Sequence, residues 1–143
     1  MKNTITIITI ILLNAFQQAY AENNYLPDSI IKEMLVGKWT ASPKDELYGT
    51  AGGLVQYNAD GTLLYTKYKT AECKVITYTV NATWGVRAKK LIVRVSNTDN
   101  SHPIKDGTIV TDRIVHIDKK NAILKNIDGI IQYRMKVNSC GKT

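Results

Sequence analysis

Apolar and polar residues alternate over much of the chain with a period of two. The clearest stretch has apolar side chains at every second position, namely Ile76, Tyr78, Val80, Ala82, Trp84 and Val86. Only an extended strand places alternate residues on opposite faces, so this segment is predicted to be one long strand with a buried face and a solvent-facing one. In 130–137 the apolar residues Ile131, Tyr133, Met135 and Val137 alternate with Gln132, Arg134 and Lys136. The apolar set is expected to face the core.

Turn-forming residues divide the rest of this region into further strands. Asn58-Ala59-Asp60-Gly61, Asp118-Lys119-Lys120-Asn121 and Asp128-Gly129 are typical of tight connections. The sequence thus predicts eight strands, at about 35–41, 52–58, 62–68, 74–86, 91–96, 108–117, 122–127 and 130–137. Short connections in sequence order favour an all-β, eight-stranded antiparallel up-and-down barrel, because closure removes both sheet edges. An open sandwich, which normally needs longer crossovers, is the alternative.

One short helix is predicted before the strands. The apolar residues Ile30, Ile31, Met34 and Leu35 recur at helical spacing. Asp28 or Ser29 is expected to cap the free amides of the first turn. Gly37 is expected to let the chain turn from this helix into the first strand.

The first 21 residues have the pattern of an export signal. Lys2 precedes a short apolar run, and Ala19-Tyr20-Ala21 matches a small-x-small cleavage site. The apolar run is shorter than the roughly 20 residues that span a bilayer. We therefore expect a cleaved signal peptide (1–21), one mature domain (22–143), no transmembrane segment, and a periplasmic or secreted location. The first cysteine, Cys73, is far from the cleavage site, so a lipoprotein is not expected.

Composition is that of one globular domain with a basic balance. The 143 residues are 44% hydrophobic and 22% charged, with a net charge of +7, which argues against disorder. The cations are scattered along the sequence, as in ordinary solubility charge, although positive charge also favours encounters with acidic partners. No nucleic-acid-binding motif is present, and nucleic acid is not an expected partner.

Two cysteines in an exported chain of this size indicate one disulfide, between Cys73 and Cys140. Such a bridge stabilises by about 4 kcal/mol in the chain-entropy description. A redox pair is the alternative, but the C-x-x-C spacing that tunes thiol acidity is absent.

Several motifs resemble a known family. Leu35-Val36-Gly37-Lys38-Trp39-Thr40 contains the Gly-x-Trp signature that opens the first strand of lipocalins and related calycins. Tyr57-Asn58-Ala59-Asp60-Gly61-Thr62, and Asp128-Gly129 followed by Tyr133-Arg134, are similar to hairpins of small bacterial lipocalin-like (calycin-type) domains. The resemblance covers nearly all of the mature chain and implies their barrel fold.

The resemblance also implies two contacts. It places an arginine of the closing strand across the Gly-x-Trp indole, and the matching residues are Arg134 and Trp39. Alternation puts Arg134 on the polar face of its strand, so this stacking requires the closed end of the barrel, outside the lumen; a solvated arginine is the alternative. In lipocalins a disulfide often ties the C-terminal tail to the middle of the barrel, as Cys140 and Cys73 would do here.

Residues that carry out chemistry are few. The two histidines, His102 and His116, lack a nucleophile context, and no activated Ser, Cys or Thr arrangement is evident. Asp99, His102 and Asp106 share one polar loop, but solvated loops contain such residues routinely. No enzyme activity, metal site or cofactor is expected.

Two functions are compatible with these features. The first is an exported lipocalin-like binding protein that holds a small, partly apolar ligand. The candidate lumen residues are Tyr57, Tyr65, Tyr78, Trp84 and Tyr133, for each of which a packed core is the alternative. The second is an inhibitor or immunity protein that binds an acidic toxin or enzyme through loops 42–53 and 97–107. A monomer is expected in both cases.

Overall fold

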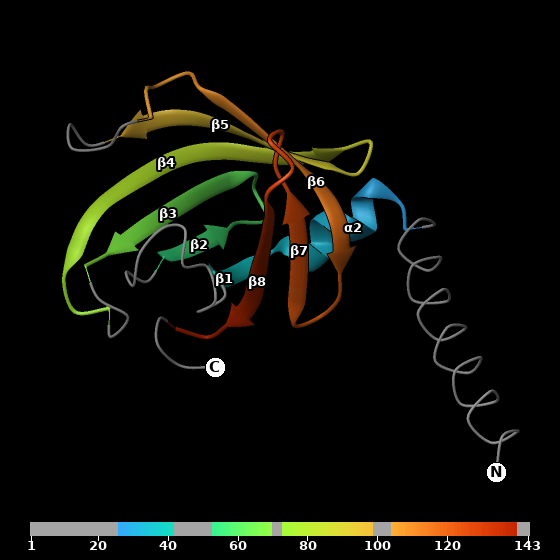
Figure 1. The fold of residues 1–143 in the computed structure, drawn as a ribbon, viewed down its shortest axis with the longest axis horizontal. Coiled ribbons are helices and arrows are strands. Elements are labelled where there is room, and N and C mark those ends of the chain that lie inside the picture. Colours follow the sequence, from blue (N-terminus) through green and yellow to red (C-terminus); the bar gives the residue numbers. More distant parts are fainter. Residues whose placement is uncertain (1–25, 42–52, 70–72, 99–103, 140–143) are drawn as a thin grey trace, which may run out of the picture.

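The structure is a computed structural model that describes residues 26–41, 53–69, 73–98 and 104–139. The predicted signal peptide (1–21), Cys140, Asp99 and His102 lie outside these residues, as do residues 42–52 and 99–103 of the two predicted binding loops. One helix precedes eight strands (Figure 1), with these bounds: α2 Asp28–Leu35, β1 Gly37–Ala41, β2 Gly53–Tyr57, β3 Thr62–Tyr68, β4 Ile76–Arg87, β5 Lys90–Thr98, β6 Ile109–Ile117, β7 Asn121–Lys125 and β8 Ile131–Val137.

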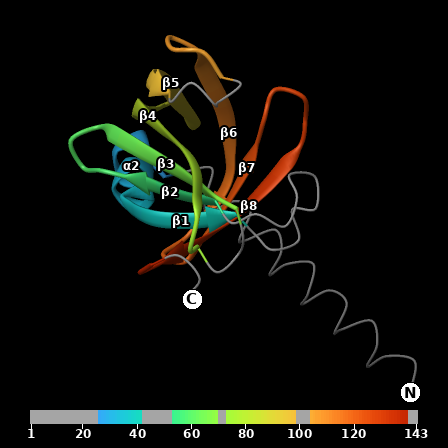
Figure 2. The ribbon, with the colours of Figure 1, turned by 90° about the vertical axis from the view of Figure 1, so that its left-hand side faces the viewer.

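The strands form a closed barrel in which each is hydrogen-bonded to its neighbours in sequence order. All pairs are antiparallel, and β1 closes the barrel by pairing with both β2 and β8, with Trp39 opposite Val55 on one side and Lys136 on the other. Viewed along the molecule, the strands run around a continuous wall (Figure 2). The predicted eight-stranded up-and-down barrel is confirmed.

Turn chemistry fixes the strand ends. In the β2–β3 turn, the Asp60 carboxylate accepts a hydrogen bond from the Thr62 amide at 2.8 Å. In the β7–β8 turn, the Asn126 side-chain oxygen accepts one from the Ile130 amide, also at 2.8 Å. The predicted strand 122–127 is therefore too long. β7 ends at Lys125, and Ile127 is 94% exposed in the turn.

Helix α2 packs its apolar side onto one end of the barrel, which we call the helix end. Ile31 and Leu35 are buried in the same cluster as Trp39, which is fully buried. The Trp39 indole Nε1 donates a 2.7 Å hydrogen bond to the Leu35 carbonyl. Gly37 has φ +125°, a backbone conformation that side chains other than glycine rarely adopt, so the predicted turn from helix to strand does depend on it.

The predicted side-chain cap of α2 is wrong. Pro27 occupies the N-cap position, and no side chain caps the first turn. Asp28 instead accepts hydrogen bonds from the backbone amides of Ala88 and Lys89, at 2.7 and 3.0 Å. The carboxylate is used to fasten the helix to the β4–β5 turn, so it is not available to the amides of its own helix.

The two ends of the barrel differ. Because consecutive strands alternate in direction, the β2–β3, β4–β5 and β6–β7 turns share the helix end with α2. The opposite end, which we call the loop end, holds the last residues of β1, β3 and β5 and the β7–β8 turn.

Candidate functional site

The inner face of the barrel is defined by strand register, since directly paired residues share a face. Trp39 is opposite Val55, Ala82 is opposite Val95, and Leu91 is opposite Val86. Tyr78, Val110 and Gln132, which follow the same alternation near the loop end of their strands, are only partly buried. This pattern indicates that solvent reaches the interior from the loop end.

Two aromatic side chains on this inner face pack together in the core. The rings of Tyr57 and Trp84 meet edge to face, with centroids 5.0 Å apart. The Trp84 Nε1 donates to the Asn58 carbonyl at 3.0 Å, and both side chains are buried. Burial raises the pKa of Tyr57; the positive charge of Arg134 offsets part of this increase and the negative charge of Asp112 adds to it, so the hydroxyl stays neutral. These two predicted lumen residues belong to the core.

A second aromatic pair, formed by two tyrosines, lies on the inner face. The ring centroids of Tyr65 and Tyr78 are 6.1 Å apart. Burial, together with the neighbouring Tyr78, raises the pKa of Tyr65 to about 12. A Cβ at Gly53 would lie 2.9 Å from the Tyr65 hydroxyl, so only glycine leaves room for this ring. Unlike Tyr57 and Trp84, both tyrosines are partly exposed.

An acidic and a basic residue face the same interior. Asp112 is 6% exposed and pairs with the buried Leu91, whereas Arg134 pairs with the buried Ala122. The Arg134 Nη2 donates to the side-chain oxygen of Gln132 at 3.0 Å. Asp112 Oδ1 and Arg134 Nε are both buried without a hydrogen-bond partner. Burial raises the pKa of Asp112, and the positive charge of Arg134 offsets part of this increase.

Arg134 and Tyr133 lie on the faces of β8 opposite to those that were predicted. Arg134 points to the interior, while Tyr133 pairs with Ile123 on the outer face and is 52% exposed. Alternation in β8 correctly separated two faces, but the apolar face was assumed to be the inner one. Here the polar set faces inward, because Lys136 is paired with Trp39 of β1 and Arg134 is paired with Ala122 of β7. Tyr133 is therefore not a lumen residue.

The cation over Trp39 is Lys136, two residues beyond Arg134. Its Nζ lies 5.1 Å from the centroid of the Trp39 ring and donates to the Met34 carbonyl at 3.0 Å. Burial lowers the pKa of Lys136. The prediction that Arg134 stacks on Trp39 is therefore wrong. A cation of the closing strand does lie over the Trp39 ring, but it is Lys136.

Asp112, Gln132 and Lys136 were missed by the sequence analysis. The position of Asp112 could have been recognised in the sequence, because this residue lies between Val110 and Ile114 at the alternate positions of β6 that are otherwise apolar. A single carboxylate at an inward position of a strand is unusual, since charged groups are seldom buried unless paired. Gln132 and Lys136 had no such signal, because they lie in a polar phase that also fits a solvent-exposed face.

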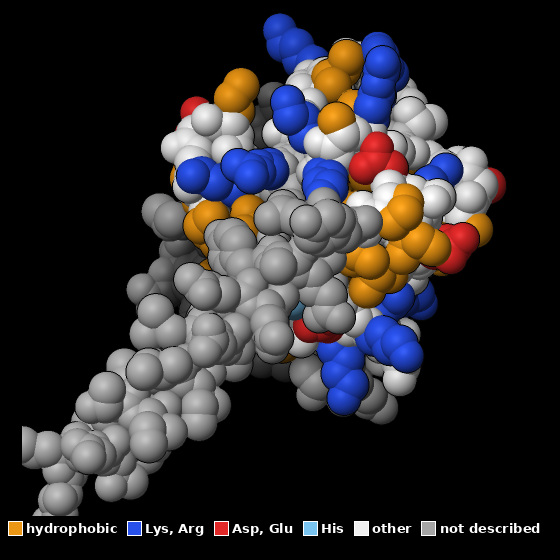
Figure 3. Space-filling view, turned by 90° about the vertical axis from the view of Figure 1, so that its right-hand side faces the viewer, with side chains coloured by type: hydrophobic (Ala, Val, Ile, Leu, Met, Phe, Trp, Pro, Cys, Tyr) orange, Lys and Arg blue, Asp and Glu red, His pale blue; other side chains and the backbone are white. Residues whose placement is uncertain are grey.

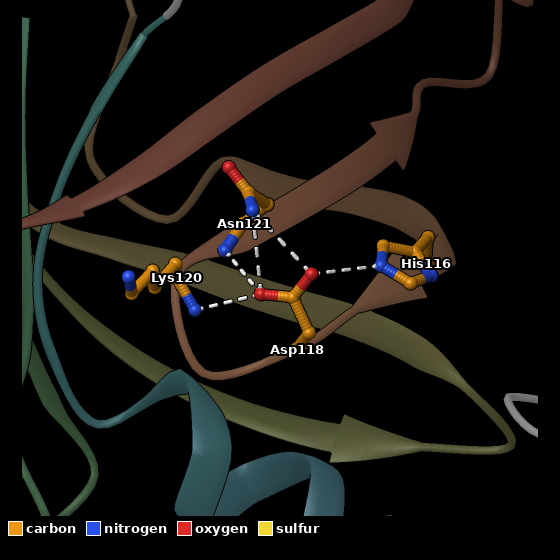
Figure 4. Close-up of polar contacts among 4 residues, drawn as sticks. All are labelled: His116, Asp118, Lys120 and Asn121. Atoms are coloured by element: carbon orange, nitrogen blue, oxygen red, sulfur yellow. Dashed lines mark hydrogen bonds and ion pairs between the residues drawn. The ribbon is translucent and has the colours of Figure 1, made fainter.

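The one histidine that the structure describes supports a turn. His116 Nε2 lies 3.1 Å from Asp118 Oδ2, and Asp118 Oδ1 accepts hydrogen bonds from the amides of Lys120 and Asn121 at 2.7 Å each (Figure 4). Burial alone would raise the pKa of Asp118, but these hydrogen bonds outweigh it and lower the pKa to about 2. The carboxylate satisfies backbone amides of the β6–β7 turn, which is a structural role.

Several basic residues that are dispersed along the sequence come together on the outer face of the barrel. Arg87, Lys90 and Arg94 lie on the outward phase of the β4–β5 hairpin, and Arg113 pairs with Lys90 from β6. A shallow hollow next to them is lined by Thr83, Trp84, Gly85, Val86, Arg87, Ile92 and Arg94. Another view of the surface shows Lys and Arg side chains with hydrophobic side chains between them (Figure 3). The outer wall thus offers a basic surface apart from the interior.

Comparison with known proteins supports the fold. A lipocalin-like protein from Bacteroides uniformis ATCC 8492 aligns with a TM-score of 0.51 and 13% sequence identity, covering 73% of this chain and 99% of that chain. No family model matches the chain, and no curated protein matches it. Together with the closed eight-stranded barrel, this similarity shows that the chain has a lipocalin-like fold.

The described residues show neither a metal-binding cluster nor a helix that could span a membrane. In that part of the chain, no three His, Cys, Asp or Glu side chains are grouped so as to hold a metal ion. Within the same ranges, no helix has the length and apolar character needed to cross a membrane. Cys73 is described and Cys140 is not, so their disulfide stays a prediction.

Proposed function

We propose that this protein binds a small, partly apolar ligand inside its barrel. The observation that carries the proposal is the pair of buried atoms without partners, Asp112 Oδ1 and Arg134 Nε. A buried polar atom without a hydrogen bond costs about 1–3 kcal/mol, and more when it is charged. A ligand that supplies the missing partners would recover this free energy.

The surroundings of these atoms suit a mixed ligand. Tyr65 and Tyr78 offer rings with polar tips, and the core beneath them is apolar. A ligand site typically combines such an apolar lining with a few polar groups that fix orientation. The partial exposure of Val110 (36%) on the inner face supports entry from the loop end.

Binding of the neutral dye N-phenyl-1-naphthylamine, followed by fluorescence, tests this proposal. We expect the wild type to bind the dye and Val110→Trp, which narrows the interior near the loop end, to bind it several-fold more weakly. The matched control is Tyr133→Trp, which adds a similar indole to the outer face of β8. Failure of the wild type to bind, or equal binding by the Val110→Trp variant, would argue against a lumen site.

We also propose that the chain is exported, that its signal peptide is removed after Ala21, and that Cys73 and Cys140 are bonded. The support is the charged and apolar pattern of 1–21 together with the cysteine count. Intact mass of protein recovered from the cell envelope or medium, measured with and without reductant, tests all three. Protein retained in the cytoplasm at full length, or two free thiols after export, would contradict them.

A second candidate is an acidic protein partner, which the basic outer wall favours. Arg87 and Arg94 flank the hollow over Gly85, and arginine pairs well with carboxylates. We expect such a partner to dissociate at high salt and to be lost from the double variant Arg87→Glu/Arg94→Glu. The control is Lys74→Glu, which reverses an exposed charge elsewhere. Salt-independent binding would exclude this surface.

A further inference from the structure

The charged groups inside the barrel constrain the polar end of the ligand. This step rests on the proposed function and concerns the same interior. Asp112 and Arg134 form no salt bridge with each other, although the charge of Arg134 affects the pKa of Asp112. Asp112 Oδ1 and Arg134 Nε are both buried and neither satisfies the other. A single polar group that contacts both atoms would satisfy both.

Each of the two atoms demands a definite kind of partner. Arg134 Nε is a donor and requires an acceptor, while Gln132 already occupies Nη2. An ionised Asp112 is an acceptor and requires a donor. The ligand must therefore present an acceptor and a donor near each other.

The charges of Asp112 and Arg134 restrict the class of ligand further. The carboxylate and the guanidinium together are neutral, and Arg134 also affects the pKa values of Tyr57 and Tyr65, which are both uncharged. A simple carboxylate ligand would pair with Arg134 but bring a second negative charge toward Asp112. A simple ammonium ligand would pair with Asp112 but bring a second positive charge toward Arg134. Burial makes such uncompensated charges expensive.

We propose that the barrel selects a ligand whose polar end is neutral overall and carries a hydrogen-bond donor beside an acceptor, as in an amide attached to an apolar chain. The amide carbonyl accepts from Arg134 Nε, and its N–H donates to Asp112 Oδ1. The apolar chain lies against the aliphatic and aromatic wall. A simple fatty acid is accordingly a poor ligand at neutral pH.

Three probes of equal chain length separate these possibilities. Octanamide is neutral with a donor and an acceptor, octanoate is an anionic acceptor, and octylammonium is a cationic donor. Their affinities for the wild type at pH 7 are measured by displacement of N-phenyl-1-naphthylamine and by titration calorimetry. We expect octanamide to bind at least tenfold more tightly than either charged probe.

A charge-neutral variant tests the assignment to residues. Asp112→Asn keeps the shape of the side chain but removes its charge, so we expect octanoate to gain at least fivefold in affinity and the preference for octanamide to shrink. Tyr133→Phe, on the outer face of β8, is the control and should leave all three affinities unchanged. Circular dichroism verifies that each variant is folded, and the comparison of probes on the wild type needs no variant.

The outcomes distinguish this inference from the proposed function. If octanoate or octylammonium binds the wild type as tightly as octanamide, the selectivity is wrong while lumen binding stands. The same holds if the dye binds but none of the three probes displaces it. If neither dye nor probe binds, both proposals fail.

Discussion

At the scale of single residues, Trp39 is held by the end of α2, four residues before it, and by the closing strand β8. The Leu35 carbonyl accepts from its indole, and the Lys136 ammonium lies over its ring. We expect Trp39→Ala to lower the free energy of unfolding by about 3–5 kcal/mol, as for other large aromatic residues removed from a core. Denaturant unfolding measures this loss. Tyr133→Ala, at a half-exposed site, is the control, and a loss below about 1 kcal/mol for Trp39→Ala would contradict the assignment.

Asp118 is expected to make stability depend on pH in the acid range. Its pKa is about 2 in the folded protein against an ordinary 3.8, so its contribution is present above pH 4 and is lost as pH falls from about 4 to 2. The side chain is 46% exposed, so screening by solvent limits the effect to about 1 kcal/mol or less. Thermal unfolding between pH 2 and 5 should show a steeper decline for the wild type than for Asp118→Asn. Parallel curves would mean that these hydrogen bonds do not persist in solution.

The positions of some single residues could be predicted from the sequence, and those of others could not. Trp39 and Gly37 were predictable, because a large aromatic in a signature motif and a glycine between helix and strand each have few structural roles. Arg134 was misplaced because alternation defines two faces without stating which one is inside. The polar residues of β8 face inward because of the register of this strand with β1 and β7, where Lys136 lies opposite Trp39 and Arg134 lies opposite Ala122. No pattern local to β8 contains that information.

At the scale of secondary structure, α2 is fastened to the β4–β5 turn by Asp28. Ala88 and Lys89 in this turn have φ of 50° and 58°, a conformation unfavourable for residues other than glycine, asparagine or aspartate. The hydrogen bonds from their amides to Asp28 support this conformation. We expect Asp28→Ala to destabilise by about 1–2 kcal/mol through lost charge-assisted hydrogen bonds.

The turn also offers a stabilising substitution. Ala88→Asn should stabilise by about 0.5–1 kcal/mol, because asparagine tolerates the left-handed conformation better than alanine. Ser29→Ala is the control for the helix start and should change little, since no side chain caps α2. Denaturant unfolding of the three variants tests the order Ala88→Asn, then Ser29→Ala, then Asp28→Ala, from most to least stable. A destabilising effect of Ser29→Ala equal to that of Asp28→Ala would restore the capping interpretation.

At the scale of the whole molecule, the barrel was predictable because its connections are short. Turns such as Asn58-Ala59-Asp60-Gly61 leave neighbouring strands no choice but antiparallel pairing, and eight such strands can close. The interior site was not predictable to the same extent. It depends on the depth and angular position of Asp112 and Arg134 around the wall, which arise from the register of strands far apart in the sequence.

The charged groups inside the barrel also predict that a substitution which raises the stability of the whole molecule lowers its affinity for the ligand. An unpaired buried carboxylate destabilises the ligand-free barrel, so we expect Asp112→Asn to be about 1–2 kcal/mol more stable than the wild type at pH 7. The pKa of Asp112 is raised by folding, so stability tied to its proton is present at low pH and is lost as pH rises above about 4 through the folded-state value. The advantage of Asp112→Asn should therefore grow with pH across this range, while its affinity for octanamide falls. Unfolding curves at several pH values, with and without octanamide, measure both effects. A variant that is less stable than the wild type at pH 7 would show that Asp112 serves the fold, because a group kept for its ligand should weaken the empty protein.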